Sequence, residues 1–177
     1  MNDGDILALE RTRHQTLPFF AAAPDSLARS YASGKWSMRG FLLHLVDCES
    51  VYLDRLRRLI ADTHPLLWNF DENRWAERLD HPDRSLAVAA TLFTATRDAV
   101  IELVRLAPAE TWARVGVHSE AGRRSIGQIV ANIHQHNDHH LSQLRAIAAG
   151  ESWQPRHAPF FSLTEPPVGR DVKKRKR

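Results

Sequence analysis

Histidines gathered in one short segment are the residues of this chain best suited to chemistry. Four of its ten histidines, His134, His136, His139 and His140, fall within seven residues, and His44 stands far upstream, directly before a run that contains Cys48 and Glu49. Imidazole is the commonest protein ligand for transition metals. The pattern therefore indicates a metal site, provided that the fold brings His44 to the cluster.

The elements that must position these histidines are predicted to be helical. Apolar residues recur at intervals of three and four in the stretches 4–22, 38–61, 84–106 and 126–149, which is the period of an amphipathic helix. Pro18 is expected to bend or end the first stretch, and no segment shows a convincing strand pattern. Four striped helices without strands predict an all-α four-helix bundle, whose sites are built from side chains that face one another across the core.

Capping residues mark the ends of two of these helices. Ser37 is suited to an N-cap, Ser125 and Gln128 to a capping box, and Gly150 to a left-handed C-terminal position. The segment 64–75 is a long connection rich in aromatic residues that can hold one short helix. Long connections of this kind often cover a site.

A helical wheel separates the four clustered histidines. At about 100° per residue, His140 lies near the middle of the apolar face of the last helix, and His136 lies one turn earlier at the flank of that face. The two form a chelating pair like that on a zincin helix, although such pairs are common without a metal. His139 and His134 point elsewhere and are read as surface residues or neighbours of the site.

The second helix supplies a third imidazole. His44 and Cys48 follow one flank of its core face, so His44, His136 and His140 are the predicted metal ligands. Three protein ligands with a position left open are the catalytic arrangement of zinc, and Ni(II) or Fe(II) fits the same donors. A single cysteine cannot build a closed thiolate site. Cys48 itself is either a core residue near the site or a variant ligand.

Glu49 is the candidate catalytic residue. It falls on the apolar side of its helix, where a carboxylate needs a partner. A structural pair with an arginine or a helix end is favoured over a general base. Asp47 is predicted to point outward. The remaining histidines show no matching pattern and are assigned to the surface or to loops: His14, His64, His81, His118 and His157.

Composition places the chain among ordinary globular proteins. Its 177 residues are 43% hydrophobic and 25% charged, which argues against a disordered or membrane-embedded chain and suits one domain. We expect a bundle over 1–155 and an extended tail over 156–177. The single cysteine, the acidic start and the lack of a long apolar run predict a cytoplasmic protein without membrane segments.

The basic character of the chain comes from its last residues. Lys and Arg number 24 against 21 Asp and Glu, but Lys173–Arg177 holds five of the basic residues, so the rest carries a net charge of −2. A terminal basic run can bind phosphates, yet a solvated tail is the simpler reading. Nucleic acid is therefore expected as a partner only weakly, through this tail.

Several motifs together resemble the DinB-like/YfiT-like superfamily. They are Lys35-Trp36-Ser37 leading to His44 through Glu49, the lead-in 116–125, and His136, His139, His140 and Gln143 in the last helix. The resemblance covers residues of about 5–150. It implies an up-down-down-up four-helix bundle that binds a divalent ion through one ligand from the second helix and two from the last. These positions are again His44, His136 and His140.

The resemblance leaves the activity open. Members include transferases and isomerases that use low-molecular-weight thiols, proposed hydrolases and proteins without an assigned reaction. The first hypothesis is a metal-dependent enzyme acting on a small molecule, by thiol transfer or by hydrolysis, with a thiol as cofactor in the first case. The alternative is a non-catalytic metal-binding or stress-associated protein. Bundle faces pair readily, so a homodimer is a further expectation.

Overall fold

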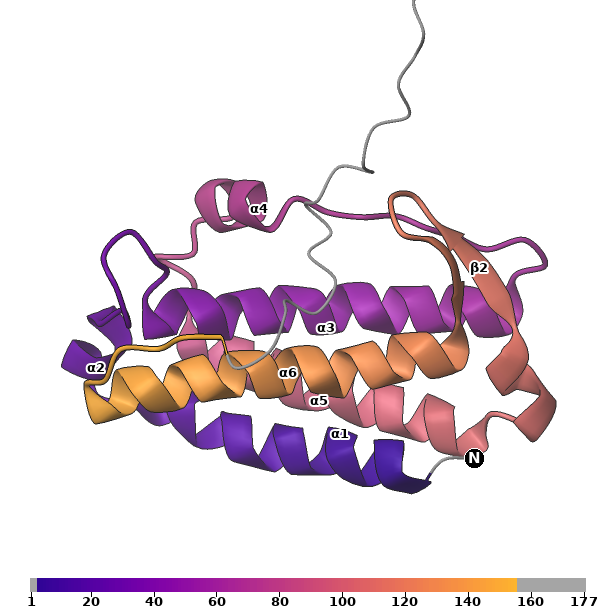
Figure 1. Ribbon diagram of the computed structural model, residues 1–177, viewed down its shortest axis with the longest axis horizontal. Helices are drawn as coiled ribbons and strands as arrows, with labels where there is room; N and C mark the ends of the chain where they lie inside the picture. Colours follow the sequence, from indigo (N-terminus) through magenta and orange to yellow (C-terminus); the bar gives the residue numbers. More distant parts are fainter. Residues whose placement is uncertain (1–2, 156–177) are drawn as a thin grey trace, which may run out of the picture.

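Four long helices form the body of the protein. The computed structural model describes residues 3–155, and its long helices are α1 (Asp3–Thr16), α3 (Met38–Ala61), α5 (Leu86–Leu106) and α6 (Ile126–Ala149) (Figure 1). The predicted bounds of α3 and α6 are confirmed to the residue. The first predicted helix ends at Thr16 and continues as a 3-10 turn, η1 (Leu17–Ala21), because Pro18 cannot extend an α-helix.

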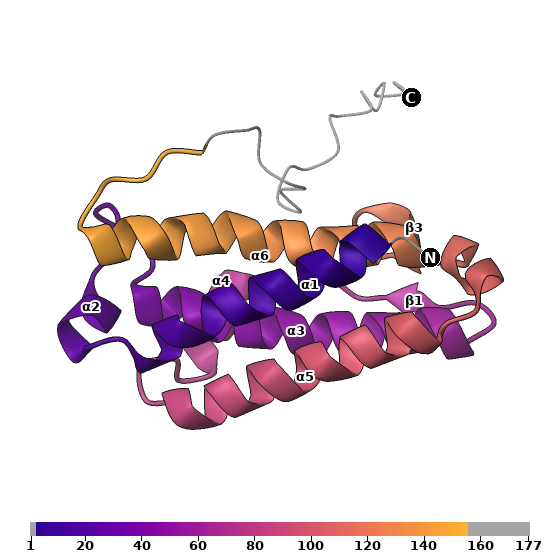
Figure 2. The ribbon, with the colours of Figure 1, turned by 90° about the horizontal axis from the view of Figure 1, so that it is seen from below.

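The bundle has the predicted up-down-down-up order. Helix α3 packs against α5 and α6, and α1 packs against the same two helices, so α1 and α3 lie on one diagonal. The colours of Figures 1 and 2 show that α3 and α5 run in one direction and that α1 and α6 run in the other. Since α3 and α5 are parallel, the connection over residues 62–85 must return along the length of α3. It carries the predicted short helix, α4 (Glu72–Arg78).

A small sheet closes one end of the bundle, which the sequence did not predict. β1 (Leu66–Leu67) pairs in parallel with β2 (Val115–His118), and β2 pairs antiparallel with β3 (Gly122–Ser125). The short elements α2 (Pro24–Ala28) and η2 (Ala109–Ala113) complete the description. A side chain at Gly116 would be crowded here, because its Cβ would lie 3.0 Å from the Pro65 carbonyl oxygen. The sheet thus fastens the connection 62–85 to the segment that leads into α6.

The predicted caps are present. The Ser37 hydroxyl accepts from the backbone N–H of Gly40, and Ser125 and Gln128 make a reciprocal capping box. Gly150 ends α6 with φ of 72°, a conformation that glycine adopts without steric cost. These contacts fix the start of both histidine-bearing helices and thereby the register of His44, His136 and His140.

The core consists of two apolar clusters with a polar layer between them. One cluster includes Leu9, Leu56 and Ile133, and the other includes Phe41 and Phe93. Between them along the helices lies a fully buried arginine, Arg97, with its partners Glu49 on α3 and Asn137 on α6. The interior of the bundle is therefore polar at the level of the histidines.

The expected tail over 156–177, including Lys173–Arg177, lies outside the described residues. Within residues 3–155, no helix combines the length and the apolar character that a bilayer crossing requires.

Candidate metal centre and its cavity

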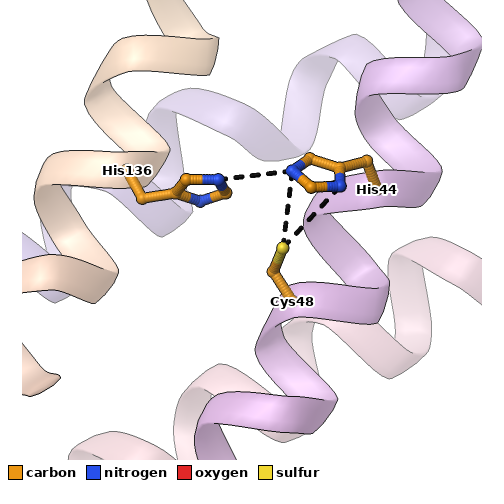
Figure 3. Close-up of side chains that lie close together, drawn as sticks. All are labelled: His44, Cys48 and His136. Carbon is orange, nitrogen blue, oxygen red and sulfur yellow. Dashed lines mark hydrogen bonds between the residues drawn. The ribbon is translucent and has the colours of Figure 1, made fainter. Parts of the chain in front are cut away.

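Three imidazoles from two helices meet at one point of the bundle. His44 of α3 has its Nε2 3.2 Å from Nε2 of His136, and His136 Nε2 lies 3.0 Å from Nε2 of His140. His136 and His140 are one turn apart on α6. The structure therefore brings together the three histidines that the helical wheels had placed facing inward. Figure 3 shows His44 and His136 reaching toward each other from the two helices.

Gln143 orients one of these rings. Its Oε1 lies 2.7 Å from Nδ1 of His140, so Nδ1–H donates to the amide oxygen and the lone pair of Nε2 is left facing the other two histidines. A carbonyl acceptor on the remote ring nitrogen is a common feature of metal-binding histidines, because it fixes tautomer and orientation. Trp36 packs against His44 with 5.0 Å between ring centroids.

Burial keeps the three rings neutral. Loss of solvation lowers the pKa of His44 and His136 well below the usual value, and the mutual proximity of the rings adds to the effect. Burial likewise lowers the pKa of His140 to about 4, against the opposing effect of the hydrogen bond that His140 donates to Gln143. Neutral imidazole is the form that binds a metal.

Cys48 lies next to the histidines. Its Sγ is 3.4 Å from His44 Nε2, and ligand atoms of His44, Cys48 and His136 all lie within 4.8 Å of one another (Figure 3). Burial, followed by the nearby Glu49 and Asp47 carboxylates, raises the pKa of the thiol well above its usual value. Both readings of Cys48 from the sequence, core neighbour and variant ligand, are therefore compatible with its position.

The donor set fits a transition-metal ion. Nitrogen ligands about 2.0–2.1 Å from a tetrahedral ion are separated by about 3.3 Å, and the Nε2 atoms of His136 and its two neighbours are 3.2 and 3.0 Å apart. All three donors are nitrogen, which suits Zn, Ni or Fe better than Mg or Ca. Two of the three pairwise separations among the imidazoles therefore match those around a tetrahedral ion, while the rings of His44 and His140 lie 4.9 Å apart between centroids.

A cavity opens directly beside the imidazoles. Its volume is about 490 Å³, and it lies between α3, α6, the connection 62–85 and the β2–β3 hairpin. His44, His136 and His140 line it together with apolar side chains such as Ile129 and polar ones such as Gln128. The long aromatic connection therefore does form part of the wall of the site, through Phe70 and its neighbours.

Glu49 is held away from this cavity. Arg97 Nε donates to Glu49 Oε2 at 2.8 Å, and Arg97 Nη2 donates to Oε1, so both carboxylate oxygens are engaged. Arg97 Nη1 also donates to the carbonyl oxygen of Leu9 and to Thr12. The expected arginine partner is present. This arrangement favours a structural role, and a role for Glu49 as a general base stays a prediction.

Asp47 is not outward-facing, contrary to the sequence prediction. Its side chain is buried and accepts from His81 Nε2 at 2.9 Å and from Arg84 Nη1 at 2.8 Å. His81, assigned to the surface or a loop, is buried as well. The helical wheel failed because it considers one helix alone, whereas the loop before α5 folds over that face of α3.

His118 is a second buried histidine that the sequence analysis assigned to the surface or a loop. It is 3% exposed and lines the cavity from the end of β2. Arg55, a cavity residue that the sequence analysis did not single out, is 4% exposed on α3. A signal was available: Arg55 lies eleven residues after His44, which is three helical turns and thus the same helix face.

His139 and His134 lie beside the site. His139 also lines the cavity, and its ring packs against His140 and Trp153 with centroids 5.1 Å away in both cases. His134 points to α1, where its Nε2 is 3.0 Å from Asp5. His139 is a neighbour of the site, as expected, and His134 connects α6 to α1.

The sequence is similar to that of a known protein family and to named proteins within reach of alignment. The sequence profile of the DinB superfamily matches residues 8–144. Two proteins of Oceanobacillus iheyensis named "Putative metal-dependent hydrolase", OB0782 and OB0413, are 28% and 25% identical over 129 and 130 residues. These alignments cover 73% and 72% of this chain, and 74% and 73% of the two relatives.

Two solved structures share the fold. YfiT from Bacillus subtilis, described as a probable metal-dependent hydrolase with an unusual four-helix bundle topology, superposes with a TM-score of 0.77 at 20% identity, over 85% of this chain and 88% of its own. A mycothiol-dependent maleylpyruvate isomerase superposes with a TM-score of 0.67 at 8% identity, over 80% of this chain and 60% of its own.

Proposed function

Because the chain belongs to the DinB superfamily and gathers three neutral imidazoles at the wall of a cavity, we propose that it is a metal-dependent enzyme acting on a small molecule. His44, His136 and His140 bind a divalent ion, Zn, Ni or Fe. The observation that carries the proposal is the pair of Nε2 separations of 3.2 and 3.0 Å beside a cavity of about 490 Å³.

The ion, when bound, supplies Lewis acidity and lowers the pKa of a water or thiol. The chain's own residues prepare the site. Gln143 fixes the tautomer of His140, and Trp36 holds the ring of His44. Apolar and aromatic side chains such as Ile129 and Phe70 cover part of the cavity wall, where they can hold the apolar part of a substrate.

Two reactions suit this arrangement. Thiol transfer, with a low-molecular-weight thiol as cofactor, needs no carboxylate base beside the ion, and the fold neighbour that uses mycothiol supports it. Hydrolysis, supported by the names of the sequence relatives, needs a proton acceptor, and Glu49 is engaged by Arg97. We therefore place thiol transfer first and hydrolysis second.

One observation favours a non-catalytic alternative. His44, Cys48 and His136 also form a compact group of ligand atoms. If Cys48 joined the three histidines around the ion, four protein ligands would close its coordination shell, as in structural zinc sites. The protein would then bind metal without access for a substrate.

Loading with Co(II) separates the two functions. The parent chain, His140→Ala and Cys48→Ala are purified, loaded, and compared for bound metal and for absorption. The enzyme proposal predicts stoichiometric cobalt in the parent and in Cys48→Ala, loss of affinity in His140→Ala, and no sulfur-to-cobalt charge-transfer band. A charge-transfer band that disappears in Cys48→Ala would support the closed site. Stoichiometric cobalt that survives His140→Ala would refute the ligand set.

The reaction is then identified by a screen of cellular thiols and electrophiles with the metal-loaded parent. Consumption of thiol together with electrophile indicates transfer, and product formation without thiol indicates hydrolysis. His140→Ala serves as the inactive control.

A further inference from the structure

Arg55 is a buried cation without a counter-ion. Its side chain lines the cavity from α3 and forms no ion pair within residues 3–155. Nη2 donates to the Trp68 carbonyl oxygen at 2.6 Å, whereas Nε is buried with no hydrogen-bond partner among the described residues. An arginine stays charged in proteins. The guanidinium lies 5.8 Å from the centroid of the Tyr52 ring, and burying its charge without a carboxylate is costly. An anionic ligand in the cavity would compensate this charge.

His118 places a second donor on the same cavity wall. Its Nδ1 accepts from the backbone N–H groups of Glu120 and Ala121 at 3.3 and 3.2 Å. Nε2 must therefore carry the hydrogen, and this N–H is also buried and without a partner in the described part of the chain. Burial and the neighbouring Arg55 and Arg124 lower the pKa of His118 to about 4. His118 is thus a neutral hydrogen-bond donor.

Other residues of the cavity wall are also suited to binding an anion. The side-chain oxygen of Asn69 is buried without a partner among residues 3–155, and half a turn of its amide would present the NH₂ group as a third donor. Arg124 adds a further positive charge to the wall, and Glu72 adds one negative charge. The Glu72 carboxylate on the same wall repels a second negative charge, which favours a singly charged ligand over a dianion.

The positions of these donors define the ligand. Arg55 lies on the same face of α3 as His44, about 16 Å along the helix at 1.5 Å per residue. The cavity surface is more apolar than polar, and Val51 and Tyr52 of α3 contribute to it between the two ends. We infer that Arg55 and His118 form a carboxylate-binding subsite, and that the substrate is an elongated apolar monocarboxylate whose reacting group lies at the histidines. The inference rests on the proposed function for its reaction but not for its binding.

Calorimetry with a matched pair of probes tests the subsite. 4-Phenylbutyrate and its neutral amide are titrated into the zinc-loaded chain and into the chelator-treated chain. We expect the carboxylate to bind at least about tenfold more tightly than the amide in both, since hydrogen bonds to a charged group are about twice as strong as those between neutral groups. Arg55→Gln should abolish this preference. Arg57→Gln, which removes an exposed arginine from the same helix, should preserve it.

Other outcomes would overturn the inference. No preference for the carboxylate, or a preference that persists in Arg55→Gln, rules out the subsite. A preference lost on chelation in the parent means that the carboxylate binds the ion instead. Inorganic phosphate that displaces 4-phenylbutyrate at lower concentration contradicts the assignment to a monocarboxylate.

If Arg55→Gln does not fold, two further measurements test whether the carboxylate subsite exists. His118→Gln should weaken the carboxylate preference, and the Arg55 Nε–H resonance of the parent should shift with the carboxylate but not with the amide. An unchanged preference and resonance would refute the subsite. A chain that prefers the carboxylate but binds no metal would refute the proposed function alone, so the two failures are distinguishable.

Discussion

At the level of single residues, Arg97 is the centre of the bundle's polar layer. It donates to groups of α1, α3 and α6 from its position on α5, and it is fully buried. One side chain thereby contacts the three other long helices. Buried ion pairs of this kind are costly to break because the remaining partner is left charged and unpaired.

Removing Glu49 should destabilise the fold strongly. Glu49→Leu leaves the Arg97 guanidinium without its carboxylate, and we expect the free energy of unfolding to fall by about 3–5 kcal/mol, measured by urea denaturation. The control is Glu10→Leu, which breaks an exposed pair with Arg105 and should cost no more than about 1 kcal/mol. Equal losses in the two variants, or parental stability together with lost turnover in Glu49→Gln, would instead support a catalytic Glu49.

Sequence patterns located some residues and not others for a clear reason. The positions of His44, His136 and His140 on the inward faces of their helices follow from helix periodicity, because the apolar stripe of each helix marks the face that packs against the core. Asp47 and His118 could not be placed in that way. Their burial depends on the loop before α5 and on the β2–β3 hairpin, which approach from distant parts of the sequence.

At the level of elements, the long helices were predictable and the sheet was not. α3 and α6 carry strong caps and long apolar stripes, so both ends could be read. β1 has two residues, and β3 has the sequence Gly-Arg-Arg-Ser, without alternation of apolar and polar residues. Their pairing with β2 depends on long-range contact rather than on local pattern.

The connection 62–85 is anchored at one end by the sheet and at the other by Asp47. His81 and Arg84 both donate to this carboxylate. Asp47→Ala should therefore loosen the connection, and we expect cleavage by added protease within 62–85 to accelerate roughly tenfold. Mass spectrometry of the fragments gives the sites.

Asp54→Ala provides the comparison, because Asp54 is an exposed residue of the same helix with its own arginine pair. Similar cleavage rates in both variants would show that the carboxylate of Asp47 does not hold the connection. Cleavage that accelerates outside 62–85 instead would indicate general unfolding.

At the scale of the whole molecule, the polar layer and the metal site are built from the same four-helix bundle. Arg97 of α5 forms the polar layer with groups of α1, α3 and α6, and α3 and α6 also carry the histidines and line the cavity. The parallel course of α3 and α5 requires a long return connection, and that connection supplies Asn69 and Phe70 to the cavity wall. Topology and site are thus linked, since a bundle with a short α3–α5 turn would lack this wall.

Buried neutral histidines make the stability of the whole metal-free protein depend on pH. Burial lowers the pKa values of His118 and His140 to about 4 in the folded state, whereas an unfolded chain titrates near 6.5. Between these values the unfolded state binds more protons, so protonation favours unfolding. The stability from this source is complete above about pH 6.5 and is lost as the pH falls toward 4.

Denaturation of the chelator-treated protein at a series of pH values measures this loss. His118→Gln should make the decline between pH 6.5 and 4 less steep, because it removes one of the groups that take up a proton only on unfolding. His64→Gln, at an exposed position of the connection, should leave the decline as in the parent. If His118→Gln and the parent lose stability in parallel, the buried state of His118 contributes nothing to the acid sensitivity of the fold.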